Sequence, residues 1–209
     1  MDKLTELADL YGTDKGNVFH KFTEFYDNTF NQYRDSFKKI VEIGIWKGES
    51  LKMWKDYFRS CKIVGADIED KNMYASERIE IRRLDQSSRE QLSKFDDCID
   101  ADLIIDDGSH IMGHQQITIG TLFPKLKPGG FYILEDLHTS FYPHGYDANP
   151  NNNTYAYIEK LKNDTQTAES LFLTKEENDY IKLNVESVEI FNRDNLNASI
   201  TCIIKKRGA

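Results

Sequence analysis

Acidic residues and histidines gather at the ends of three short segments of this 209-residue chain. The segments are EIGIWKGES at 42–50, IIDDGSH at 104–110 and YILEDLHTS at 132–140. Each begins with an apolar run that predicts a strand. Ligands of an open parallel sheet bind outside the carboxyl ends of its strands. The three segments are therefore predicted to converge on one crevice, with a cofactor site beside a metal site.

Hard oxygen ligands are the first part of this prediction. Asp107, Glu135 and Asp136 would lie at the ends of neighbouring strands, and no cysteine is close to them in the sequence. Such ligands favour Mg²⁺ over Zn²⁺. Glu135 and Asp136 would point to opposite faces of a regular strand, so the strand must end before them if both are to reach one ion. The alternative interpretation is that these acids are helix caps and loop residues.

A histidine beside such an ion could act as a general base near neutral pH. His110, three residues after Asp107, is the predicted base. For His114, His138 and His144 a capping or exposed position is the preferred interpretation. His20 is expected to lie apart from the others, on an N-terminal helix.

Residues for a cofactor follow the first four strands of the predicted sheet. Glycines in the first strand-to-helix turn would let a ligand approach the backbone, although a tight turn alone could also require them. A carboxylate ending the second strand could accept hydrogen bonds from the ribose hydroxyls of an adenosine. The predicted cofactor residues are Glu42, Gly44, Gly48, Ser50, Asp67, Asp85, Gln86 and Asp106.

The same turn indicates which adenosine cofactor would bind. A dinucleotide site needs Gly-x-Gly-x-x-Gly, but Trp46 stands in the place of the second glycine. Glu49 would repel a pyrophosphate at the start of the following helix. S-adenosylmethionine carries no phosphate and has two positive centres, so the sequence favours it over a nicotinamide dinucleotide.

The elements that position these residues alternate between strands and helices. Such an order is typical of a doubly wound parallel sheet. The predicted fold class is α/β, a Rossmann-like sheet of seven strands with the last antiparallel, preceded by N-terminal helices. The strands are KIVEIG, KIVGADI, RIEIRRL, ADLIIDD and GGFYILED, then NVESVEIFN and ASITCIIKK as an antiparallel hairpin.

The length predicts one domain over 1–209. Residues 1–37 are expected to form a helical cap of two helices separated by YGTDKG. Aromatic residues at helical spacing in the second helix, from Phe19 to Phe30, are interpreted mainly as packing. The polar segment 137–160 is a possible lid loop.

The composition excludes several classes of partner. A net charge of −8 argues against nucleic acid. No apolar run approaches the roughly 20 residues needed to cross a bilayer, so no membrane association is expected. Three cysteines without metal-finger spacing indicate reduced thiols and a cytoplasmic location. Homo-oligomer formation is left open.

Several segments together resemble the macrolide-sugar O-methyltransferases, a group of class I S-adenosylmethionine methyltransferases. The resemblance runs from about residue 10 to 142, and IDDGSH followed by EDL is its most specific part. It implies that Asp107, Glu135 and Asp136 hold Mg²⁺ and that His110 is the base. We expect the chain to depart from the group in a shorter glycine turn and in the absence of a large N-terminal extension. The matching segments are YGTDKG, EIGIWKGESLKMWKDYF, VGADIEDK, DQSS, IIDDGSH and GGFYILEDLHTS.

The sequence therefore predicts Mg²⁺-dependent methyl transfer to a sugar hydroxyl of a glycosylated metabolite or polysaccharide precursor. Two other functions are weighed against it. One is a metal-dependent hydroxylase, in which His110, His138 and a carboxylate would imitate an iron triad. The other is a module that binds S-adenosylmethionine without turnover.

Overall fold

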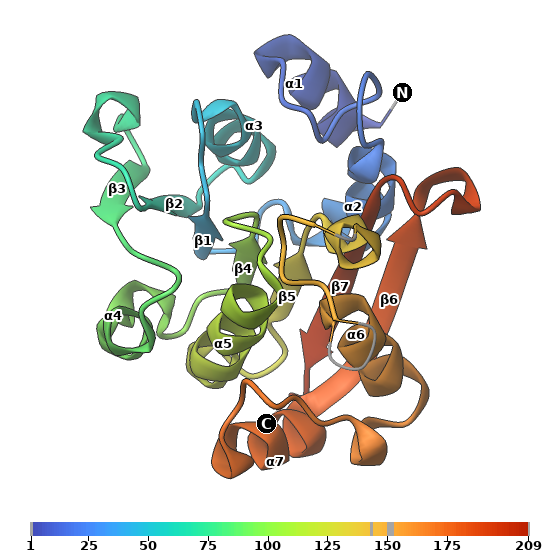
Figure 1. Ribbon diagram of the computed structural model, residues 1–209. Helices are drawn as coiled ribbons and strands as arrows, with labels where there is room; N and C mark the ends of the chain where they lie inside the picture. Colours follow the sequence, from blue (N-terminus) through green and yellow to red (C-terminus); the bar gives the residue numbers. More distant parts are fainter. Residues whose placement is uncertain (1, 143, 150–152, 209) are drawn as a thin grey trace.

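A single seven-stranded sheet runs through the computed structural model, which describes residues 2–142, 144–149 and 153–208 (Figure 1). The strand order is β3-β2-β1-β4-β5-β7-β6. The predicted seven strands with an antiparallel end are confirmed. The strands are β1 (Lys39–Ile43), β2 (Lys62–Asp67), β3 (Ile79–Arg83), β4 (Leu103–Asp106), β5 (Phe131–Leu134), β6 (Val185–Asn192) and β7 (Ile200–Lys206).

The pairing of the strands decides which edge carries the site. Strands β1 to β5 are mutually parallel, whereas β7 runs antiparallel to both β5 and β6. The carboxyl ends of the five parallel strands therefore lie along one edge. Leu134, the last residue of β5, pairs with Cys202 of β7. The amino-terminal end of β7 thus reaches the same edge.

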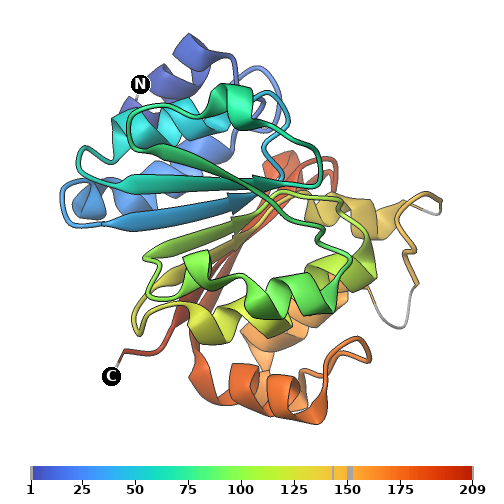
Figure 2. The same ribbon diagram turned by 90° about the vertical axis from the view of Figure 1, so that its left-hand side faces the viewer.

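Helices cover both faces of the sheet (Figure 2). The first three pack on one face, and the later ones, drawn in green to orange, pack on the other. Each face has its own apolar core, with Trp54 fully buried in one and Phe123 in the other. The helices are α1 (Lys3–Tyr11), α2 (Phe22–Phe30), α3 (Glu49–Tyr57), α4 (Arg89–Lys94), α5 (Met112–Leu122), α6 (Thr154–Asn163) and α7 (Lys175–Asn184).

Backbone hydrogen bonds at the end of α1 and the start of α2 fix the path of the N-terminal segment. Helix α1 ends at Gly12, whose positive φ of 75° allows the chain to turn back. The carbonyl oxygen of Lys15 then accepts hydrogen bonds from the amides of Phe22 and Thr23. On α2, Phe22, Tyr26 and Phe30 are fully buried, which confirms the packing interpretation for these three.

Part of the segment 137–160, predicted as a possible lid, has regular structure. Leu137–Phe141 forms a 3₁₀ helix, and α6 begins at Thr154. Residues 143 and 150–152 of the segment lie outside the described residues. Among the described residues, no helix combines the length and the apolar character needed to cross a bilayer.

Candidate cofactor and metal site

Three strand ends meet at the site, as the sequence predicts. The amide of Asp107 donates to the carbonyl of Ile43 at 2.8 Å, and the amide of Glu135 donates to Asp106 at 2.9 Å. These bonds hold the residues that follow β4 and β5 in line with the end of β1. Strand β5 ends at Leu134. The expectation that this strand stops before the two acids is therefore confirmed.

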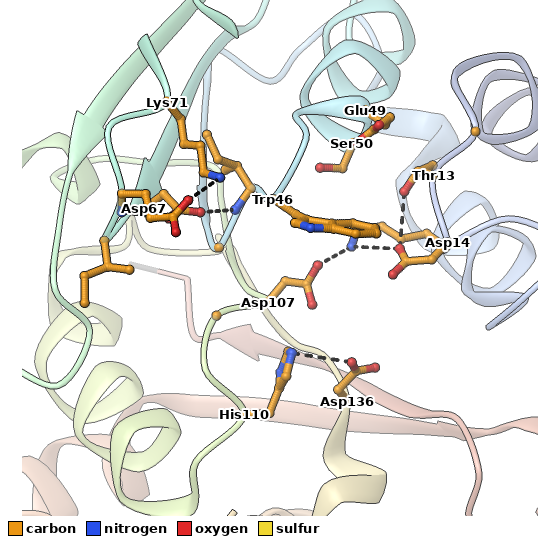
Figure 3. A pocket seen from close by; sticks show the side chains of 17 residues that line it. Thr13, Asp14, Trp46, Glu49, Ser50, Asp67, Lys71, Asp107, His110 and Asp136 are labelled. Atoms are coloured by element: carbon orange, nitrogen blue, oxygen red, sulfur yellow. Dashed lines mark hydrogen bonds and ion pairs between the residues drawn. The ribbon is translucent and has the colours of Figure 1, made fainter. Parts of the chain in front are cut away.

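A pocket of about 400 Å³ opens at this edge of the sheet (Figure 3). Its walls come from the segment after α1, the turn after β1, the end of β2 and the segments after β4 and β5. A second pocket of about 290 Å³ shares Gly44, Asp67, Ile68 and Gly108 with it. The first is lined by Gly12, Thr13, Asp14, Lys15, Gly44, Ile45, Trp46, Glu49, Ser50, Asp67, Ile68, Glu69, Lys71, Asp107, Gly108, His110 and Asp136.

Asp67 and Gly44 stand at the junction of the two pockets. The Asp67 carboxylate accepts hydrogen bonds from the amides of Ile45 at 3.1 Å and Glu69 at 3.0 Å. Gly44 has a φ of 83°, and a side chain there would collide with the backbone of Asp107 and Gly108. A glycine is therefore required for the close approach of two strand ends. Both residues lie where a cofactor spanning the two pockets would contact them.

The remaining predicted cofactor residues fall into two groups. Ser50 lines the first pocket, whereas Asp85 and Gln86 line the second. Glu42, Gly48 and Asp106 line neither of these pockets. Gly48 is the N-cap of α3, with a φ of 72°. Glu42 and Asp106 support the walls from behind, through Ser50 and Gln86.

Glu42 and Asp106 are fully buried carboxylic acids. Glu42 accepts a hydrogen bond from the Ser50 hydroxyl at 3.0 Å, and Asp106 accepts one from the Gln86 amide nitrogen at 2.5 Å. Burial raises the pKa of Glu42 to about 7 and that of Asp106 to about 7. Gln86 also accepts from the amide of Ser109 at 2.8 Å. It thereby links the ends of β3 and β4.

A candidate cation site lies in the wall of the first pocket. Asp107, His110 and Asp136 each offer a ligand atom, and these atoms lie within 4.8 Å of one another. Asp136 Oδ1 and His110 Nδ1 are buried without a hydrogen-bond partner. Buried polar atoms normally have partners. An oxygen-rich group with unsatisfied buried atoms therefore fits a hard divalent cation.

His110 is placed for a role in proton transfer. Its Nε2 lies 3.5 Å from Asp136 Oδ2, and its side chain is partly exposed in the pocket. Both residues have left-handed backbone, with φ of 57° for His110 and 55° for Asp136. The two turns direct both side chains toward the same space (Figure 3).

Two further histidines approach Asp136. His138 Nδ1 is 3.7 Å and His20 Nε2 is 3.9 Å from Asp136 Oδ1. The expectation that His20 lies apart is wrong: it precedes α2, and its Nδ1 is 2.9 Å from the hydroxyl of Ser199. The contact with Ser199 spans 179 residues. No local sequence pattern indicates it.

Lys15 is the residue that sequence reasoning missed. Its side chain is 1% exposed, and its Nζ lies 2.5 Å from Asp107 Oδ2 and 2.8 Å from Glu135 Oε2. Burial alone would lower the pKa of Lys15, but the carboxylates of Asp107, Glu135 and Glu42 outweigh it and raise the pKa well above its ordinary value. Lys15 is therefore a buried ammonium within the acidic group.

Glu135 points into this buried group. Its Oε1 accepts a hydrogen bond from the Tyr26 hydroxyl at 3.0 Å, and that hydroxyl is 2.7 Å from Thr201 Oγ1. The side chain is 2% exposed and is not among the three whose ligand atoms cluster. Burial raises the pKa of Glu135 well above its ordinary value. Its predicted role as a metal ligand remains a prediction.

Comparison with known proteins identifies relatives of this chain. The chain is 41% identical over 148 residues to the 8-demethyl-8-alpha-L-rhamnosyl tetracenomycin-C 2'-O-methyltransferase of Streptomyces olivaceus. It is 40% identical over 156 residues to the demethylmacrocin O-methyltransferase of Streptomyces fradiae. The aligned parts make up 67% and 70% of this chain.

The chain is related to the antibiotic-sugar O-methyltransferases. The MycE methyltransferase of the mycinamycin biosynthetic pathway, solved with Mg and S-adenosylhomocysteine, superposes on 99% of the chain with a TM-score of 0.83 and 30% identity. Another structure of MycE also contains mycinamycin VI. No protein-family model matches the chain.

The region aligned with this chain makes up only part of each relative. The aligned region makes up 39% of the Streptomyces olivaceus enzyme, 40% of the Streptomyces fradiae enzyme and 55% of the MycE chain. All three proteins are named as methyltransferases. They therefore give no support to the alternative of a metal-dependent hydroxylase.

Proposed function

We propose that this chain transfers a methyl group from S-adenosylmethionine to a sugar hydroxyl of a glycosylated metabolite or polysaccharide precursor, with the help of Mg²⁺. One observation carries the proposal. The cluster of Asp107, His110 and Asp136 lies on the wall of a pocket that shares Gly44 and Asp67 with a second pocket. The arrangement suits a cation and an acceptor beside an elongated nucleoside cofactor.

The proposed cofactor residues are those of the first four strand ends. Asp67 would accept hydrogen bonds from the ribose hydroxyls. Asp85 and Gln86 would lie along the second pocket, while Ser50 would lie along the first. The backbone at Gly44 and Gly48 would leave room for the ligand, and Glu42 and Asp106 would support these walls from inside.

The proposed metal residues are Asp107, Glu135 and Asp136. A bound divalent cation would act as a Lewis acid that lowers the pKa of a nearby hydroxyl. A free alcohol has a pKa near that of water, about 15.7, and imidazole has a pKa near 6.5, so His110 alone is a poor match for this proton. A cation held by these carboxylates would bring the two pKa values closer together, and it would help to orient the acceptor toward the methyl group.

His110 is the proposed general base. His110 and Asp136 both line the larger pocket, 3.5 Å apart, and the carboxylate would stabilise the imidazolium formed when the ring takes the proton. Asp136 would also fix the orientation of the ring. The support for this role is the geometry of the pair and the position of His110 in the wall of the larger pocket.

Methyl transfer is the direct test. The purified chain is supplied with methyl-labelled S-adenosylmethionine and a panel of deoxysugar-bearing acceptors, with Mg²⁺ or with EDTA. Labelled product that requires Mg²⁺ is expected. Calorimetry with S-adenosylmethionine and with NAD, each with and without Mg²⁺, tests the cofactor independently of the acceptor. Binding of NAD but not of S-adenosylmethionine would refute the proposal.

Asp107→Asn, with Asp100→Asn as its matched control, tests the proposed role of Asp107 as a metal ligand. Asp100 is exposed and precedes β4, whereas Asp107 follows that strand at the opposite edge of the sheet. We expect Asp107→Asn to lose methyl transfer and Asp100→Asn to keep it. Full activity of Asp107→Asn would refute the proposed role.

A further inference from the structure

Lys15, in the segment after α1, makes buried contacts with the acidic residues that follow β4 and β5. Its ammonium touches Asp107 Oδ2 and Glu135 Oε2, while the other oxygen of Glu135 is held by Tyr26. The hydroxyl of Tyr26 is in turn next to Thr201 of β7. Two carboxylates from different strand ends therefore hold the lysine, and residues of α2 and β7 help to hold one of these carboxylates.

The backbone of Lys15 is fixed as firmly as its side chain. Its carbonyl oxygen accepts from the amide of Phe22 at 2.9 Å and from that of Thr23 at 3.3 Å. These are amides of the first residues of α2, which have no partner within the helix. Lys15 is thus held at both ends, so its Nζ presents a fixed point of positive charge to Asp107.

The contact leaves only part of Asp107 free. One carboxylate oxygen is bound to the buried ammonium, and Figure 3 shows the other on the side of His110 and Asp136. A carboxylate held by a buried charged donor cannot rotate freely. The partners of metal ligands orient those ligands, and their removal typically lowers metal affinity by about 10- to 100-fold.

We propose that Lys15 is a positioning residue for the metal site: it locks the carboxylate of Asp107 so that its free oxygen faces His110 and Asp136. This inference rests on the proposed function only in assuming that the site binds a divalent cation. Lys15 acts on the cation through Asp107 and has no role in proton or methyl transfer. Its effect is therefore on metal affinity.

A second explanation of Lys15 is simple charge balance. One ammonium lies among the carboxylates of Glu42, Asp107 and Glu135, at 3.8, 2.5 and 2.8 Å. Removing Lys15 together with the carboxylate of Glu42, the farthest of the three, leaves the net charge of this group unchanged. Glu42 is the carboxylate to remove, because its other oxygen accepts a hydrogen bond from Ser50. Among the described residues, Glu42 and Asp107 share no hydrogen bond. The double variant therefore separates positioning from charge.

The experiment measures Mn²⁺ binding by electron paramagnetic resonance at pH 8, without acceptor or turnover. The variants are Lys15→Met, Lys15→Met/Glu42→Gln and the matched control Lys71→Met. Lys71 lines the same pocket but pairs with Glu69. We expect both Lys15 variants to bind Mn²⁺ about 10- to 100-fold more weakly than the natural chain, and Lys71→Met to bind within about twofold.

Melting curves and circular-dichroism spectra check that each variant is folded, and the double variant keeps the net charge of the buried group unchanged. Natural affinity in the double variant would show that Lys15 only balances charge and would overturn the proposal. Tighter binding by Lys15→Met would show that the lysine competes with the cation, with the same consequence. Absence of Mn²⁺ binding by the natural chain would overturn the metal part of the proposed function as well.

Discussion

His110 and Asp136 face each other across the ends of β4 and β5, with His110 Nε2 3.5 Å from Asp136 Oδ2 and left-handed backbone at both residues. Alanine at either position would combine loss of the side chain with backbone strain of about 1–2 kcal/mol. Asparagine tolerates this conformation better. It is therefore the substitution that isolates the chemistry.

His110→Asn is expected to lower the rate of methyl transfer by about 10²- to 10⁴-fold, because a general base contributes that much. The melting temperature should change little. His144→Asn is the control, since His144 is exposed in the segment after β5. Rates with a saturating acceptor and calorimetry with S-adenosylmethionine check the prediction. A rate within threefold of the natural chain would exclude His110 as the base.

Asp67→Asn is expected to weaken S-adenosylmethionine binding by about tenfold or more. A carboxylate can accept from both ribose hydroxyls, whereas an amide offers a single acceptor, and a hydrogen bond to a charged group contributes about 1.5–3 kcal/mol. Asp70→Asn is the control on the same loop, because among the residues that the structure describes the Asp70 carboxylate accepts a hydrogen bond only from the amide of Asn72. Equal calorimetric affinities for the two variants would remove Asp67 from the cofactor site.

Gly44→Ala should destabilise the fold much more than Gly129→Ala. Both glycines have positive φ, 83° and 75°, so both substitutions carry similar backbone strain of about 1–2 kcal/mol. Only at Gly44 would the new methyl group meet the backbone of Asp107 and Gly108, whereas the space at Gly129 is open. Overpacking adds about 1–3 kcal/mol. Urea unfolding of the two variants measures the difference, and equal losses would contradict the close approach.

The raised pKa of Glu42 predicts how the stability of the fold depends on pH. Burial raises its pKa from 4.5 to about 7 in the folded chain. Between these values the folded state binds a proton that the unfolded state has released, so the contribution of Glu42 to stability falls as the pH rises from about 4.5 to about 7. In Glu42→Gln the decline in unfolding free energy from pH 5 to pH 8 should be smaller by about 1–3 kcal/mol. Identical pH profiles for the two proteins would contradict the raised pKa.

The sheet and much of the site were predictable because they depend on local patterns. The apolar runs ending in EIG, IIDD and YILED mark strands, and parallel strands bring their ends together. That reasoning places Gly44, Asp107 and Asp136 at one edge, where the structure has them.

Lys15, Tyr26 and His20 could not be found in the same way. A lysine in a polar turn is expected in solvent, and a tyrosine at helical spacing is expected in the core. Their partners lie far away in the sequence: 92 residues separate Lys15 from Asp107, and 109 separate Tyr26 from Glu135. The only local signal is that YGTDKG places a lysine three residues after the helix-ending Gly12. That signal does not indicate burial.

The position of β7 inside the sheet, between β5 and β6, has a consequence for biosynthesis. Tyr26 meets Thr201 and His20 meets Ser199, across 175 and 179 residues. Synthesis must therefore reach Ser199 and Thr201 before His20 and Tyr26 can find these partners. Contacts of such long range slow folding. Until they form, the edge of β5 that pairs with β7 is left without its neighbouring strand.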